Sequence, residues 1–287
     1  MADKERIMAE RKLLEKVDVR DAFRAKNPRV AKLIPGFVYW YIKKIVHQKE
    51  MNDFLKVYGK RTGIDFINAV IEDFNVHIII EGEENIPLHG RLQFVANHPL
   101  GGFDGMILMH IISKYFKNIK FLVNDILMNI LNIEELFIPV NTFGRQSVQY
   151  ARRIDEEYAS DAQILNFPAG ICSRKIGGRI IDLEWKKSFI SKSIQHKRDI
   201  LPVHFGGSNS NFFYNLSNLR KALGIKANIE LFFLADEMYR QKNRTVAVKF
   251  GQVIPYSTFD KSRTHQEWAK WVKDKVYALN GVYDVPL

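Results

Sequence analysis

The chain has 287 residues, enough for one large domain or two small ones with a sizeable core. Its formal net charge of +11 favours an anionic partner such as nucleic acid, an anionic bilayer or an acidic carrier, although a merely well-solvated basic surface explains it equally well. The only cysteine, Cys172, excludes an internal disulfide and every multi-cysteine zinc pattern.

The amino-terminal sequence is densely charged and lacks an apolar core of signal-peptide length, so we expect a cytoplasmic protein. No stretch approaches the roughly 20 apolar residues that span a bilayer. Residues 33–46, LIPGFVYWYIKKIV, combine four aromatic side chains with two lysines, which is typical of a segment lying in a membrane interface. A buried helix packed on the main domain accounts for the same composition.

Residues 1–75 are predicted to form a helical, possibly membrane-interfacial arm, followed by an α/β domain over residues 76–287. Predicted strands cover residues 76–87, 91–98, 119–125, 137–140, 162–170, 199–208, 228–235 and 245–256. Predicted helices cover residues 101–116, 126–137, 147–161, 211–224 and 264–279, and a basic loop and helix occupy residues 171–198. This alternation predicts a mostly parallel central sheet flanked by helices.

Ligands of open α/β sheets bind where strands end and loops lead into helices. Three such loops stand out, at residues 97–104, 167–175 and 202–208. In the first, Asp104 can hold one ring nitrogen of His98 and leave the other free as a general base, while Gly101 and Gly102 allow close approach of a substrate. A helix-capping Asp and a structural His remain the alternative.

Competing chemistries have weaker support. The chain has no Gly-x-Ser-x-Gly, no Walker phosphate loop and no His-Glu-x-x-His, and no metal site is predicted. Cys172 has basic neighbours that would lower its pKa, but a lone cysteine without an assigned base is more often a packing residue. No motif of a known nucleic-acid reader occurs, so no nucleic-acid partner is expected.

Taken together, the three loops resemble the glycerolipid acyltransferase superfamily, typified by 1-acylglycerol-3-phosphate acyltransferase. NHPLGGFD corresponds to its Asn-His-x4-Asp block, with one residue more before Asp104. FPAGICSRK followed by EWKKSF matches its Phe-Pro-Glu-Gly-Thr-Arg-Ser block and the lysine segment beyond it, and ILPVHF matches its Val/Ile-Pro-Val block. The Phe-Ile-x-Arg block is matched only loosely, with Arg145 displaced.

The resemblance implies a glycerol-3-phosphate acyltransferase-like fold and acyl transfer from a thioester of acyl carrier protein or coenzyme A to the hydroxyl of a lysolipid, with no tightly bound cofactor. By analogy His98 is the base and Asp104 orients it. The substrate-binding residues that it implies are Asn97, Gly101, Gly102, Arg145, Gly170, Ser173, Arg174 and Lys175. An enzyme of this kind would be peripheral on the inner face of the cell membrane and would meet an anionic lipid surface.

Two departures from the family pattern bear on the acceptor. Ala169 stands where the family has a Glu that helps to bind it, and the extra residue between His98 and Asp104 alters the local geometry. Both departures weigh against lysophosphatidate as the acceptor. They look more like the hemolysin-like branch, whose O-acyltransferases make aminoacyl lipids. The alternatives are a non-catalytic lipid-binding protein of the same fold and, more weakly, a basic nucleic-acid-binding protein.

Overall fold

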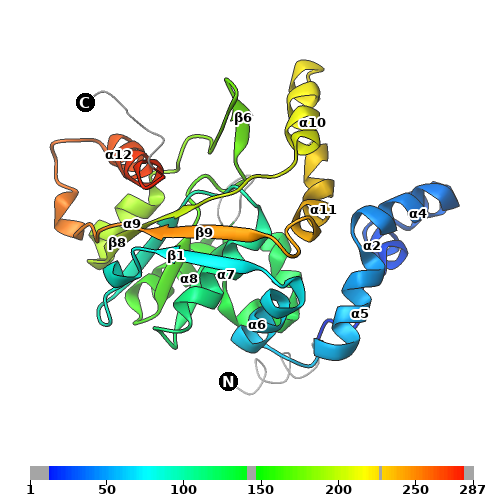
Figure 1. The fold of residues 1–287 in the computed structure, drawn as a ribbon, viewed down its shortest axis with the longest axis horizontal. Helices are drawn as coiled ribbons and strands as arrows, with labels where there is room; N and C mark the ends of the chain where they lie inside the picture. Colours follow the sequence, from blue (N-terminus) through cyan, green and yellow to red (C-terminus); the bar gives the residue numbers. More distant parts are fainter. Residues whose placement is uncertain (1–12, 141–146, 226–227, 281–287) are drawn as a thin grey trace.

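The computed structural model describes residues 13–140, 147–225 and 228–280. Its nine described strands are β1 (His77–Glu81), β2 (Leu92–Ala96), β3 (Ile119–Asn124), β4 (Phe137–Val140), β5 (Gln163–Asn166), β6 (Arg174–Ile176), β7 (Arg179–Ile181), β8 (Asp199–Phe205) and β9 (Thr245–Phe250). Seven of them form one sheet in the order β1-β9-β8-β2-β5-β3-β4 (Figure 1). Within this seven-stranded sheet only the β8–β9 pair is antiparallel, so the predicted mostly parallel central sheet is confirmed. Strands β6 and β7 form a separate antiparallel pair.

Helices lie on both sides of this sheet. Within the described residues the α-helices are α2 (Val19–Lys26), α3 (Pro28–Leu33), α4 (Gly36–Ile45), α5 (Gln48–Tyr58), α6 (Gly63–Phe74), α7 (Gly102–Ile112), α8 (Val148–Ala159), α9 (Ser188–His196), α10 (Asn211–Ala222), α11 (Leu234–Tyr239) and α12 (His265–Ala278). Short 3-10 helices are η1 (Glu83–Asn85), η2 (Asp125–Asn129), η3 (Leu131–Leu136), η4 (Ile229–Phe233) and η5 (Tyr256–Thr258). None of these helices has the length and apolar character to cross a bilayer.

Alternating side chains of the strands divide the core into two layers, as the period of two in a strand requires. In β2, Phe94 packs in the cluster that includes α6 and α7, whereas Val95 packs in the cluster of α9 and α12. In β5, Leu165 belongs to the first layer and Ile164 packs beside α8. The sheet is therefore covered by α6 and α7 on one face and by α8, α9 and α12 on the other.

The segment predicted as an arm has two parts. Its last helix, α6, buries Phe66, Ile67 and Val70 in the main core. Helices α2–α5, which we call the arm, lie at one side of the sheet, beside α10 and α11 (Figure 1). His47, in the short link before α5, joins the arm to α11 by a hydrogen bond to Asp236 (3.0 Å) and by stacking on Tyr239.

Two sequence predictions of secondary structure are wrong. Residues 228–235 are not a strand but η4 and the start of α11, and this turn places Glu230 in the interior beside two arginines. Residues 126–137 form the short helices η2 and η3 instead of one α-helix. In both segments the run of apolar residues is ambiguous in period, and tertiary contacts decide the local structure.

At the amino ends of the central strands, one buried arginine joins several segments. The guanidinium of Arg198 donates hydrogen bonds to the backbone carbonyls of Leu92, Glu157, Tyr158, Ser160 and Ala162. Burial lowers the pKa of Arg198 to about 10, which still leaves it charged at neutral pH. The loop that contains His98 lies at the other edge of the sheet, after the carboxyl end of β2.

Candidate active site

The first loop connects β2 to α7 within five residues, 97–101. Gly101 precedes the helix with φ +70°, a conformation that glycine adopts readily. A Cβ atom at this position would lie 3.1 Å from Leu234 Cδ2, so α11 packs closely on the loop. This sharp turn brings Asp104, in the first turn of α7, back toward the strand end.

His98 and Asp104 form a hydrogen-bonded pair, as predicted. The distance from His98 Nδ1 to Asp104 Oδ2 is 3.0 Å, and the Leu100 backbone N–H donates to the same oxygen at 2.8 Å. The imidazole also stacks on Phe167, with ring centroids 4.4 Å apart. Because Nδ1 faces the carboxylate, Nε2 is the nitrogen left to exchange a proton with a substrate.

Burial gives this carboxyl unusual acid–base behaviour. Asp104 is fully buried, whereas 16% of the His98 side chain is exposed. Burial raises the pKa of Asp104 to about 6, against the opposing effect of the hydrogen bond from His98. The Asp104 carboxyl therefore loses its proton near pH 6, and its ionised form accepts a hydrogen bond from the His98 Nδ1–H.

Sequence reasoning missed a second buried carboxylate, Asp182, just after β7. Its Oδ1 accepts hydrogen bonds from the His98 backbone N–H (3.2 Å) and the Ser173 hydroxyl (2.6 Å), and its Oδ2 accepts one from Trp185 Nε1 (2.8 Å). The Ser173 backbone N–H in turn donates to the His98 carbonyl at 2.7 Å. Asp182 and Ser173 thus hold the backbone of His98 from both sides. An acid at the end of the run Arg-Ile-Ile was the only available signal.

The predicted binding residues fall into two groups. Gly102 and Gly170 are exposed beside the pair: a Cβ at Gly102 would meet no atom within 4 Å, and one at Gly170 would lie 3.2 Å from Lys186 Nζ. The Lys175 ammonium is within reach of the Asn211 side chain at 3.2 Å. These three residues thus remain accessible, as a role in substrate binding requires.

The other predicted binding residues are in the interior. Asn97 bridges two strand ends through both backbone polar groups of Phe205, at 2.7 and 2.9 Å. Arg174 is 1% exposed, and its guanidinium pairs with Glu230 at 3.1 Å. Its charge is therefore balanced inside the protein. Arg145 lies outside the described residues.

Cys172 and Ala169, both in the FPAGICSRK segment, are buried. Cys172 is buried, and burial raises the pKa of its thiol to about 11 despite the nearby guanidinium, which favours a packing role over a nucleophilic one. Ala169 is also buried, in the apolar cluster with Trp185 and Phe189. A Glu at position 169 would enter this apolar cluster.

His204, in the ILPVHF segment, lies buried in β8. Burial, together with Lys249 on the neighbouring strand, lowers the pKa of His204 to about 4, so that it stays neutral. In the part of the chain described, no group of three or more His, Cys, Asp or Glu side chains gathers as a metal site. The arrangement is thus a buried-carboxylate–imidazole base at the carboxyl edge of a parallel sheet, a geometry suited to deprotonating a hydroxyl.

Comparison with known proteins agrees with this chemistry. An acyltransferase family model matches residues 22–286, and the chain belongs to this acyltransferase family. It is 49% identical over 264 residues to the lyso-glycine lipid O-acyltransferase of Bacteroides thetaiotaomicron, covering 92% of this chain and 97% of that protein. Identity to the enzyme of the same name from Phocaeicola vulgatus is 47%, with coverage of 92% and 95%.

Among solved structures, the chain is similar to the 1-acyl-sn-glycerophosphate (LPA) acyltransferase PlsC from Thermotoga maritima. The match has a TM-score of 0.46 and 16% identity, and it covers 77% of this chain and 83% of that one. The protein is an acyltransferase on the strength of the family model and the sequence relatives, which span nearly its whole length.

Proposed function

We propose that the protein transfers a fatty acyl chain from a thioester to the hydroxyl of a lysolipid, with a lyso-glycine lipid as the acceptor. The observation that carries this proposal is the His98–Asp104 pair at the strand ends of an acyltransferase-family chain. The acceptor is inferred from two lyso-glycine lipid O-acyltransferases that are nearly half identical to this chain. The buried, apolar surroundings of Ala169 also favour an acceptor other than lysophosphatidate.

In the proposed mechanism, His98 Nε2 removes the proton of the acceptor hydroxyl while Asp104 stabilises the imidazolium that forms. The oxygen attacks the thioester carbonyl and forms the new C–O bond, and the negative charge moves to the carbonyl oxygen. Collapse of this intermediate breaks the C–S bond, and His98 returns the proton to the departing thiolate. Backbone N–H groups of Gly101, Gly102 or Gly170 are the candidates for holding the oxyanion.

The glycine head group of the acceptor would offer a carboxylate. Lys175 belongs to the loop at residues 167–175, and the ammonium of Lys186 lies beside Gly170 of the same loop, so we assign this anion to these two lysines. Arg145 remains a predicted contact. Ser173 and Arg174 support the loop from inside, through Asp182 and Glu230 respectively.

The donor is proposed to be acyl carrier protein or coenzyme A carrying the acyl chain. The protein would act as a peripheral protein on the inner face of the cell membrane, because its acceptor has an acyl chain that resides there. The arm supports this placement: Phe37, Trp40 and Tyr41 are more than half exposed on α4.

The decisive experiment incubates purified protein with a lyso-glycine lipid and either a radiolabelled acyl-carrier-protein thioester or the coenzyme A thioester. We expect diacylated product from one of the two donors, and a loss of at least about 10³-fold in kcat/KM for His98→Ala. Wild-type turnover by His98→Ala would refute the mechanism. Inactivity of the wild type with both donors on every lysolipid, despite binding the lipid, would favour the non-catalytic alternative.

A further inference from the structure

Helix α10 buries Phe213, Tyr214 and Arg220 and leaves a second row of apolar side chains exposed to solvent. Phe212, Leu219 and Leu223 are 51%, 57% and 65% exposed, and with half-buried Leu216 they follow the i, i+4, i+7, i+11 spacing of one helix face. On the buried side of the helix, the charge of Arg220 is balanced by Glu230 at 2.8 Å. The outer face of a helix that meets only water carries polar side chains instead of such a row of leucines.

The apolar face continues into two neighbouring elements. Phe212 packs edge-to-face on Phe233 of η4, with ring centroids 4.9 Å apart, and the adjacent Phe232 is 62% exposed. Trp40 and Tyr41 of the arm line a depression of about 330 Å³ together with Phe212 and Phe233. The exposed faces of α10, η4 and α4 therefore meet, and we call this surface the apolar platform.

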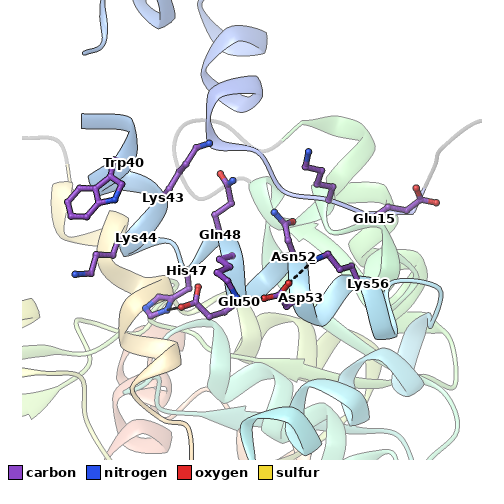
Figure 2. Close-up of a pocket in the computed structure, with 12 residues that line it drawn as sticks. Glu15, Trp40, Lys43, Lys44, His47, Gln48, Glu50, Asn52, Asp53 and Lys56 are labelled. Carbon is purple, nitrogen blue, oxygen red and sulfur yellow. Dashed lines mark hydrogen bonds and ion pairs between the residues drawn. The ribbon is translucent and has the colours of Figure 1, made fainter. Parts of the chain in front are cut away.

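Basic side chains flank the apolar platform. On α4, Phe37, Trp40, Tyr41 and Lys44 follow the i, i+3, i+4, i+7 spacing of one face, and Lys44 lies over the Trp40 ring at 5.7 Å. Figure 2 shows Trp40 and Lys44 side by side on this helix, at the rim of a second depression of about 720 Å³ on the arm that five lysines line.

The platform leads directly to the candidate base. Leu234 follows Phe232 and Phe233 in the chain, and it packs against Gly101, three residues after His98. Only η4 and the start of α11 therefore separate Phe232 on the platform from the loop that carries His98.

We propose that α10, η4 and α4 together form a docking surface for an anionic lipid bilayer, so that the α/β domain itself, and not only the arm, rests on the membrane. Aromatic and leucine side chains would enter the interface, and Lys44 would meet anionic head groups. The inference builds on the proposed use of a membrane lipid, but binding alone tests it.

The test measures co-sedimentation of the full-length protein with vesicles of equal parts phosphatidylglycerol and phosphatidylcholine, without donor or acceptor. The variant Leu219→Ser/Leu223→Ser removes exposed side chains of α10 only. Its matched control, Ile79→Thr/Leu88→Ser, removes two apolar side chains that are 51% and 70% exposed elsewhere. We expect the α10 variant to bind about tenfold more weakly and the control to bind as the wild type does.

Activity on a water-soluble short-chain lysolipid separates this inference from the proposed function. The α10 variant should keep wild-type turnover there, together with its circular dichroism and melting temperature. Unchanged vesicle binding by the α10 variant would overturn the inference. So would a wild-type dimer that the same variant dissociates, because the platform would then be an interface between copies of the chain.

Discussion

The His98–Asp104 pair combines a mostly buried imidazole, 16% exposed, with a carboxyl that no solvent reaches. Because the pKa of Asp104 is raised to about 6, the proton on this carboxyl is lost only as the pH rises through that value. Proton transfer from the acceptor requires the ionised carboxylate. Acidification therefore removes activity at a higher pH than it would for an ordinary aspartate.

We expect kcat to rise with pH through a limb near 6 and then level off, a limb that belongs to the coupled pair. The Asp104→Asn protein should turn over roughly 10³-fold more slowly at its plateau. The same raised pKa means that the folded state binds the proton more tightly than the unfolded state. The stability that protonated Asp104 contributes to the folded state is thus lost as pH rises from about 4 to 6. Urea titrations at several pH values would detect this loss. An acid limb below pH 5 would contradict this account.

Asp182 acts through the backbone of His98, and its removal tests whether that position matters. In Asp182→Asn one acceptor oxygen remains for three donors, so we expect kcat to fall about tenfold while the KM for the acceptor stays within about twofold. Asp155→Asn is the matched control, since Asp155 pairs with Lys192 and His196 on the surface of α8. Equal effects of both substitutions on kcat would rule out a positioning role.

Among the elements, η4 depends on the pair of arginines that it neutralises. Glu230 is fully buried between Arg174 and Arg220, at 3.1 and 2.8 Å. Glu230→Gln leaves two buried guanidinium groups without a counter-charge, and we expect a loss of about 3–5 kcal/mol in the free energy of unfolding. Denaturant unfolding measures it. A Glu237→Gln protein serves for comparison, because Glu237 accepts hydrogen bonds from Ser210 but balances no buried arginine.

How far the sequence predicts these elements depends on the range of the contacts. The strands and the His98–Asp104 pair were predictable because hydrophobic periodicity is local and the pair lies six residues apart in one loop. Asp182 lies 84 residues from His98, and Glu230 lies 56 from Arg174. Such pairings depend on how the β6–β7 hairpin and η4 fold back, which no periodicity records. For that reason the sequence does not predict that Arg174, an expected substrate-binding residue, is buried in an ion pair with Glu230.

Considered as a whole, the molecule has its chemical loops at the carboxyl edge of the sheet and its aromatic arm beside α10 and α11 (Figure 1). Replacing Trp40 and Tyr41 with Ser removes two exposed aromatic rings of α4. We expect at least about tenfold weaker binding to phosphatidylglycerol-containing vesicles, with little change in melting temperature. A protein with both substitutions that still binds vesicles normally would show that the arm is not an anchor.

The five carbonyls gathered by Arg198 lie at the end of the sheet that is remote from His98. The buried Arg198 network and the His98–Asp104 pair thus lie at opposite ends of the same strands. Such a division gives the family room to evolve: loops at one end can be rewritten for a new acceptor while the other end keeps the chain folded. The same separation makes the strand-start residues a suitable place to seek thermostable variants whose substrate preference is unchanged.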